Sequence, residues 1–477
     1  MTTGMFRRKD ASGDAQHGGH QLARTLSWPH LVALGVGAIV GTGILTLIGV
    51  GAGLAGPAVI LSFAIAGAIC ACAALAYAEM ATMMPVSGSA YTYSYAVLGE
   101  IIAWVVGWSL LAEYTLVVAT VAVGWSGYAT GFLAGLGVAL PDALTHGPAI
   151  VDGAVASWGV NVPALFILAV VSGLLMLGTK ESANLNAVLV VVKIIALIVF
   201  VGVALPSYDA ANMAPFSPFG FAKDGVVGAD GVTVERGVMA AAAIIFFAFY
   251  GFDAISTAAE ETKNPGRDLA IGIVGSMLAC VVIYMVVAVA AVGALSYTRF
   301  AGSPEPLALI LREIGQNEAA AFLAVSAVIA LPTVILAFLY GQSRIFFVMA
   351  RDGLLPASLA TVSRRGVPVR ITVFTALVVA LFAGFLPIGA IAALANAGTL
   401  TAFIAVAVCM LVLRRRSPDS PRPFRTPAAW LVGLGAIFGC LYLFISLPSS
   451  TQLWFLAWNV VGLVAYLIGY SIRGRRV

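Results

Sequence analysis

The chain has 477 residues, of which 61% are hydrophobic and only 10% are charged, and its mean hydropathy is +1.02. A soluble core of this size could not use so much apolar surface, so the composition predicts an all-α polytopic membrane protein. The net charge of +4 lies in short segments between apolar runs. This pattern sets membrane orientation and requires no nucleic-acid partner.

Twelve apolar runs have about the 20 residues that a helix needs to cross the hydrocarbon core. The expected spans are residues 29–54, 57–83, 99–135, 162–178, 184–206, 237–260, 268–297, 318–350, 369–387, 389–413, 428–447 and 451–472. Residues 1–28 are expected to form a disordered cytoplasmic tail. They do not resemble a cleaved signal peptide, because the basic run Arg7–Lys9 is followed by a polar stretch.

The distribution of Lys and Arg over the connections tests this count of spans. With twelve spans the two termini lie on the same side, where 20 of the 25 cations fall, against four on the opposite side. Since cytoplasmic segments carry the excess of Lys and Arg, both termini are predicted to be cytoplasmic. The remaining cation, Lys193, lies in the middle of the fifth span.

Two spans are interrupted at corresponding positions. Gly41 and Gly43 lie near the middle of the first span, and Gly251 precedes Asp253 in the sixth. Glycines at that depth favour local unwinding, although close packing through small residues is an alternative for the first span. Two such segments indicate a secondary transporter built from inverted repeats. The expected units are residues 29–206, residues 237–413 and a pair of extra helices in residues 428–472.

Free backbone groups at two helix breaks can receive an anionic group at one helix end and a cation at the other. The expected site therefore suits a zwitterion. A zwitterion with a variable remainder is an amino acid.

Several longer motifs resemble one transporter family. They are Gly41–Ile44, Tyr77–Glu79, Pro85–Tyr91, Gly107–Tyr114, Phe246–Asp253, Glu260–Pro265 and Tyr340–Pro356. The chain resembles the cationic amino acid transporter branch of the amino acid-polyamine-organocation (APC) superfamily from Phe6 to its end. This resemblance implies a LeuT/APC-type fold with a 5+5 inverted repeat plus two extra helices, twelve transmembrane helices in all. It also implies an amino acid substrate and a bacterial cell membrane.

The resemblance further implies which residues hold the substrate. Backbone amides around Gly41 to Gly43 would bind its carboxylate, carbonyls at the two breaks would bind its amine, and Phe247 would cover it. The predicted substrate-binding residues are Ile39, Gly41, Thr42, Gly43, Ile44, Phe246, Phe247, Ala248, Tyr250 and Leu331. Lys193 matches a fifth-helix lysine that, in proton-coupled members, occupies the place of sodium in sodium-coupled relatives.

The chemistry of Lys193 follows from its burial. Placing a charge near the bilayer centre costs about 2.5 to 3.5 kcal/mol on insertion scales, so such a residue is a functional candidate. Desolvation destabilises the ammonium and nearby carbonyls stabilise it, so small changes in access to water can move its proton on or off. We expect Lys193 to couple proton flow to substrate flow. A purely structural ammonium is the alternative.

Two carboxylates, Glu113 and Asp253, also lie well inside spans and are expected to face the bundle interior or a wet path. The resemblance marks the Glu113 position as one needed for transport of cationic substrates. Asp253 could equally cap the broken sixth helix or carry protons.

One departure from the family pattern is Pro332 in the eighth span. It is expected to kink the helix that forms one wall of the pocket. Beside it, the bulky Leu331 would favour small neutral amino acids over arginine or lysine.

No catalytic motif supports an enzyme, and neither a metal nor a cofactor beyond the coupling proton is expected. The expected partners are an amino acid substrate and membrane lipid, and the oligomeric state stays open. The sequence favours proton-coupled symport of an L-amino acid. An amino acid exchanger or a transporter-like amino acid sensor remains an alternative.

Overall fold

The computed structural model describes residues 26–86, 88–151, 154–176, 183–227, 233–355 and 369–474. Residues 1–25 of the predicted tail, which covers residues 1–28, lie outside these ranges. Every predicted span contains helix, which confirms the all-α polytopic fold. Within the described residues, all but two of the predicted spans contain a helical stretch that is long and apolar enough for a membrane crossing. The exceptions are the shorter apolar helices α7 (Val162–Met176) and α15 (Val369–Phe385).

The first span is divided into α1 (Trp28–Ile39), α2 (Thr42–Leu45) and α3 (Leu47–Ala55), and the sixth into α9 (Val238–Ile245) and α10 (Asp253–Thr257). The other long helices are α4 (Val59–Met83), α6 (Glu100–Gly135), α8 (Ala183–Ala204), α11 (Pro265–Ala294), α14 (Asn317–Arg351), α16 (Ile388–Arg416), α17 (Ala429–Ser446) and α18 (Ser449–Gly474).

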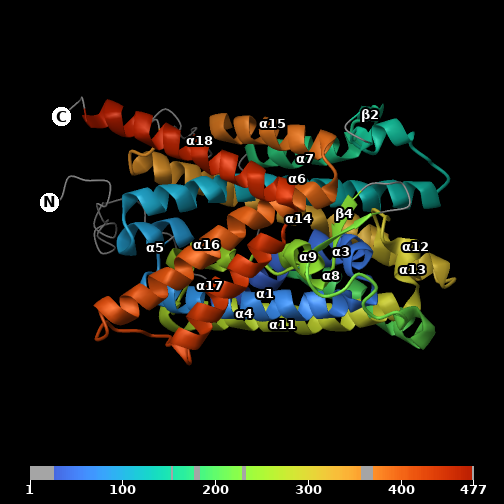
Figure 1. The fold of residues 1–477 in the computed structure, drawn as a ribbon, viewed down its shortest axis with the longest axis horizontal. Helices are drawn as coiled ribbons and strands as arrows, with labels where there is room; N and C mark the ends of the chain where they lie inside the picture. The colour runs from blue at the N-terminus through green and yellow to red at the C-terminus, as the bar shows by residue number, and fades with distance from the viewer. Residues whose placement is uncertain are drawn as a thin grey trace.

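The connections gather at two ends of the bundle (Figure 1). One end, the hairpin end, carries two antiparallel hairpins and two short helices: β1 (Ala149–Val151) with β2 (Ala154–Ser157), β3 (Asp224–Val227) with β4 (Thr233–Arg236), α12 (Tyr297–Phe300) and α13 (Pro306–Glu313). The opposite end, the α5 end, carries α5 (Ser89–Val97) and the last turn of α18. Helix α6 follows α5, so it runs from the α5 end to the hairpin end.

Burial separates the central helices from the peripheral ones. Of the 18-residue apolar stretch within the broken span Val238–Thr257, 94% is buried, whereas only 17% is buried of the corresponding stretch within Ser449–Ser471. A helix that is apolar on all sides is either surrounded by protein or faces lipid. The broken span therefore lies in the protein core, and α18 presents a largely apolar face, with Leu453 and Trp454 both 68% exposed, to the membrane.

Helices α6 and α14 form the most extensive helix pair in the bundle. Helix α14 continues through Pro332, where a ring replaces the N–H that would bond the carbonyl of Val328 four residues earlier. The indole N–H of Trp125 on α6 donates to this carbonyl at 2.9 Å. A neighbouring helix thus supplies the Val328 carbonyl with a donor in place of the N–H that the proline lacks. The predicted kink at Pro332 stays a prediction.

Glu79 ties three segments together near the α5 end. Its carboxylate is 1% exposed and accepts hydrogen bonds from Arg414 Nε at 2.8 Å and Arg414 Nη2 at 2.6 Å. The Thr426 N–H donates to the same group at 2.9 Å, and Arg422 Nε lies 3.2 Å away. This carboxylate is buried with full compensation, as a buried charge requires.

Candidate functional site

The first break lies between α1 and α2. Helix α1 ends at Ile39, Val40 is extended with φ −73° and ψ 99°, and Gly41 caps α2 with φ −157° and ψ −144°. The first amides of a helix have no partner within it. The backbone of Gly41, Thr42 and Gly43 therefore offers N–H donors in the middle of the bundle.

The second break separates α9 from α10. A single 3₁₀ turn, Phe246–Ala248, follows α9, and Gly251 then adopts φ +116°, which a residue with a side chain rarely adopts. Asp253 opens α10, and its Oδ1 accepts the Gly251 N–H at 3.1 Å. The sequence prediction of interruptions in both spans is confirmed at the backbone level.

The two breaks touch each other. A Cβ atom on Gly43 would lie 2.3 Å from the Cα of Ala248, and one on Gly251 would lie 3.0 Å from the carbonyl carbon of Ala38. The glycines therefore allow the two main chains to approach more closely than any side chain would permit.

A small inner cavity of about 10 Å³ lies at these breaks. Its lining residues are Ala38, Ile39, Gly41, Thr42, Gly43, Val117, Val121, Phe247, Tyr250, Val334 and Phe338. Six of the ten predicted substrate-binding residues are among them: Ile39, Gly41, Thr42, Gly43, Phe247 and Tyr250.

The other four predicted residues lie just behind this lining. Ile44 is fully buried, and Phe246 packs edge-on against Phe403 with ring centroids 5.7 Å apart. Ala248 contacts Gly43, as described above. Leu331 has its nearest methyl carbon 3.9 Å from the position of a Cβ on Gly41, so it supports the break from outside the cavity.

Sequence reasoning missed Ala38 and four side chains on the two flanking helices. Val117 and Val121 are four residues apart on α6, as are Val334 and Phe338 on α14. Residues at that spacing share a helix face. The spacing was the available signal, but both helices are apolar all round, so it did not distinguish this face from any other.

Backbone carbonyls at the breaks have partners of their own. The Ile39 carbonyl accepts the Tyr284 hydroxyl at 2.8 Å, and the Phe246 carbonyl accepts the Phe249 N–H at 3.0 Å. Carbonyls at the two breaks were predicted to bind the substrate amine. A carbonyl oxygen has two lone pairs, so each retains the capacity to accept a second hydrogen bond.

Lys193 reaches the first break from α8. Its side chain is 4% exposed, and Nζ donates to the Gly37 carbonyl at 3.0 Å. Gly37 lies in the last turn of α1, where carbonyls have no intrahelical partner and the helix dipole favours a cation. The ammonium thus lies at the negative end of the first half-helix, one turn from the cavity.

Glu113 and Asp253 both lie on the α5 side of the cavity. Glu113 precedes Val117 by one turn of α6, or about 6 Å along the axis. The adjacent Tyr114 donates its hydroxyl to Asp253 Oδ2 at 3.4 Å, which brings α6 and α10 together. The two carboxylates lie within electrostatic range of each other.

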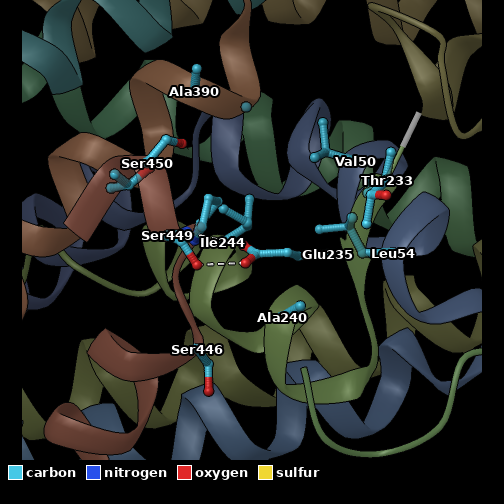
Figure 2. A pocket seen from close by; sticks show the side chains of 14 residues that line it. Val50, Leu54, Thr233, Glu235, Ala240, Ile244, Ala390, Ser446, Ser449 and Ser450 are labelled. Atoms are coloured by element: carbon cyan, nitrogen blue, oxygen red, sulfur yellow. Dashed lines mark hydrogen bonds between the residues drawn. The ribbon is translucent and has the colours of Figure 1, made fainter. Parts of the chain in front are cut away.

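A larger outer cavity of about 540 Å³ lies at the hairpin end (Figure 2). Its walls come from α3, β4, α9, the start of α16 and the connection between α17 and α18. Ile244 lines this cavity, and Phe247, less than one helical turn later, lines the inner one. The Asn396 side chain donates to the carbonyls of Ala243 at 2.7 Å and Ile244 at 3.0 Å, which holds α16 against this turn.

Glu235 fastens one wall of the outer cavity. Its carboxylate accepts the Ser449 hydroxyl at 2.6 Å, shown in Figure 2, and the Ser449 N–H at 3.0 Å. Lys223 Nζ lies 3.5 Å from the same carboxylate and donates to the Leu447 carbonyl at 2.9 Å. The β3–β4 hairpin is thereby joined to the α17–α18 connection.

Known proteins resemble this chain over nearly its whole length. A family model described as amino acid permease matches residues 26–467. The branched-chain amino acid permease BcaP of Bacillus subtilis is 43% identical over 98% of both chains, and the methylthioribose transporter of the same organism is 39% identical over 97% of both. The vacuolar cationic amino acid transporter 2 of Arabidopsis thaliana is more distant, at 38% identity over 87% of this chain and 64% of its own length.

These relatives are permeases and transporters, not enzymes. The observed bundle of apolar helices, with two broken helices around a small central cavity, is consistent with a protein of this class. The chain is an integral membrane protein that belongs to the amino acid permease family.

Proposed function

We propose that this protein carries a neutral L-amino acid with a branched apolar side chain across a bacterial cell membrane, together with a proton. The observation that carries the proposal is the inner cavity between the two helix breaks, with Lys193 bonded one turn away. The α2 amides would bind the substrate carboxylate. The free lone pairs of break carbonyls would bind its amine.

The cavity wall favours an apolar substrate side chain. Val117 and Val121 on α6 and Val334 and Phe338 on α14 form the wall opposite the breaks. None of the cavity-lining residues is charged. A cationic side chain would lose its hydration against this apolar lining, which is costly. The 43% identity to a branched-chain amino acid permease supports the same substrate class.

Proton coupling rests on the position of Lys193. The bond to the Gly37 carbonyl is stronger for the charged ammonium than for the neutral amine, so it favours the protonated form, and a change in hydration around the amine alters that balance. A lysine whose protonation follows the state of α1 would link proton movement to substrate movement. Both termini would lie in the cytoplasm, as the distribution of cations predicts.

Uptake into proteoliposomes tests the proposal. An inward proton gradient should drive leucine, isoleucine and valine above equilibrium, and arginine and lysine should not compete. Methylthioribose belongs in the competition panel because of the second relative. Accumulation of arginine without leucine would contradict the proposed substrate class. Leucine exchange that does not depend on the pH gradient would favour an exchanger. Binding without movement of either kind would indicate a sensor.

A further inference from the structure

Glu113 is buried without the compensation that Glu79 has. It is 1% exposed, and neither of its side-chain oxygens has a donor in good hydrogen-bond geometry among the described residues; the side-chain donor that faces it is the neutral hydroxyl of Thr399 on α16. Glu79 has the same exposure but binds Arg414 and the Thr426 amide. Glu79 thus has an arginine and a backbone N–H to stabilise its negative charge, and Glu113 has neither among the described residues.

The groups around Glu113 supply no positive charge among the described residues. The titratable groups that face it are Asp253 on α10, Tyr77 on α4, Tyr114 on its own helix and Tyr250 at the second break. From α16 it meets Gly398 and Thr399, neither of which titrates. From α14 the nearby polar group is Gln342, whose amide donates to Thr115. Lys193 lies on α8, which packs mainly on α14 and α1.

The neighbouring Asp253 has the donors that Glu113 lacks. It accepts the Gly251 N–H at 3.1 Å and the Tyr114 hydroxyl at 3.4 Å. Two carboxylates that share a buried site do not both ionise, and an uncompensated buried ion costs several kcal/mol. The negative charge therefore belongs on Asp253.

We propose that Glu113 and Asp253 hold one exchangeable proton in this closed conformation, with Glu113 as the neutral carboxylic acid and Asp253 as the carboxylate. This is a second proton site, distinct from Lys193. The protonation state rests on the burial of Glu113 and on the donors that Asp253 has and Glu113 lacks, whereas its use in transport rests on the proposed function.

Tyr250 connects this pair to the substrate. Its ring lines the inner cavity, and its buried hydroxyl has no partner among the described residues while lying within electrostatic range of both carboxylates. When the α5 end opens and water reaches Glu113, the acid gives its proton to water. The resulting carboxylate is then solvated by that water. The proton leaves on the same side as the substrate.

Infrared spectroscopy of the purified full-length protein tests the protonation state without any transport. Wild type should show the C=O stretch of a buried carboxylic acid, and Glu113→Gln should lose it. The matched control is Glu235→Gln, which removes a carboxylate at the hairpin end and should leave that band unchanged. A folded Glu113→Gln variant that keeps the whole band would overturn the proposal.

Proton counting in proteoliposomes tests the exchange. A dye inside the vesicles reports protons that enter with leucine, and Glu113→Gln should move fewer protons per leucine than wild type while still performing leucine counterflow. An unchanged ratio would refute proton exchange at Glu113. A sodium requirement in wild type that Glu113→Gln abolishes would show that the site takes a metal cation. If wild type moves no leucine at all, the proposed function fails while the infrared result still stands.

Discussion

Lys193 donates to the Gly37 carbonyl in the last turn of the half-helix α1, so we expect its charge to depend on the position of α1. Lys193→Met should abolish leucine accumulation driven by a pH gradient, because it removes the proton-exchanging group that is bonded to α1. Lys193→Arg separates the two possible roles, since arginine keeps the cation but does not release its proton. Accumulation should be lost in both variants. Recovery with arginine would show a purely structural cation.

Trp125 compensates for Pro332, and this pairing can be tested through stability. Trp125→Phe keeps most of the ring but leaves the Val328 carbonyl without its donor. An unpaired carbonyl away from water costs about 1 to 3 kcal/mol, so the variant should unfold at a lower temperature or denaturant concentration. Trp454→Phe is the control, because Trp454 is 68% exposed on the membrane-facing side of α18. Equal stability of the two variants would argue against this compensation.

At the scale of elements, the break in the sixth span depends on Gly251. With φ at +116° and the main chain of Ala38 at 3.0 Å from a Cβ, Gly251→Ala should cost about 1 to 3 kcal/mol and weaken leucine binding. A thermal-shift titration with leucine measures both effects. Gly202→Ala is the matched control, because Gly202 lies on α8 with open space at its Cβ position. At this position alanine should leave the free energy of unfolding unchanged or raise it by up to about 1 kcal/mol.

A second prediction at the scale of elements concerns the contact of Glu235 with Ser449 and Lys223, which joins β4 to the α17–α18 connection and is called the latch below. Burial raises the pKa of Glu235, but the hydrogen bonds from Ser449 and the charge of Lys223 outweigh it, so its pKa lies below the ordinary value of 4.5. A lowered carboxylate pKa means that the latch contributes stability above that value. The contribution is lost as pH falls through the lower, folded-state pKa.

Hydrogen exchange at the β3–β4 hairpin measures this effect. Protection of the hairpin amides should fall in acid in wild type, whereas Glu235→Gln should be less protected at neutral pH and should show a weaker dependence on pH. Identical acid profiles for the two proteins would contradict the latch.

For the whole molecule, the sequence predicted what depends on length, charge and glycine. The twelve spans followed from apolar runs, and the breaks followed from Gly41, Gly43 and Gly251. The residues of α6 and α14 that line the inner cavity were not predicted, because a helix that is apolar on every side has no periodic pattern that marks one face. The hairpins were also missed, since strands of three or four residues leave little pattern.

At about 10 Å³ the inner cavity has room for about one water molecule, far less than an amino acid needs. Substrate must therefore bind an expanded form, and its apparent dissociation constant is the intrinsic one divided by the fraction of protein in that form. Each 1.4 kcal/mol needed for expansion weakens apparent affinity about tenfold. That cost is shared by all substrates, so larger apolar side chains, which gain more on burial, should compete best. Glycine and alanine would then bind weakly because their side chains bury too little apolar surface to offset the cost of expansion. No steric clash is needed to exclude them.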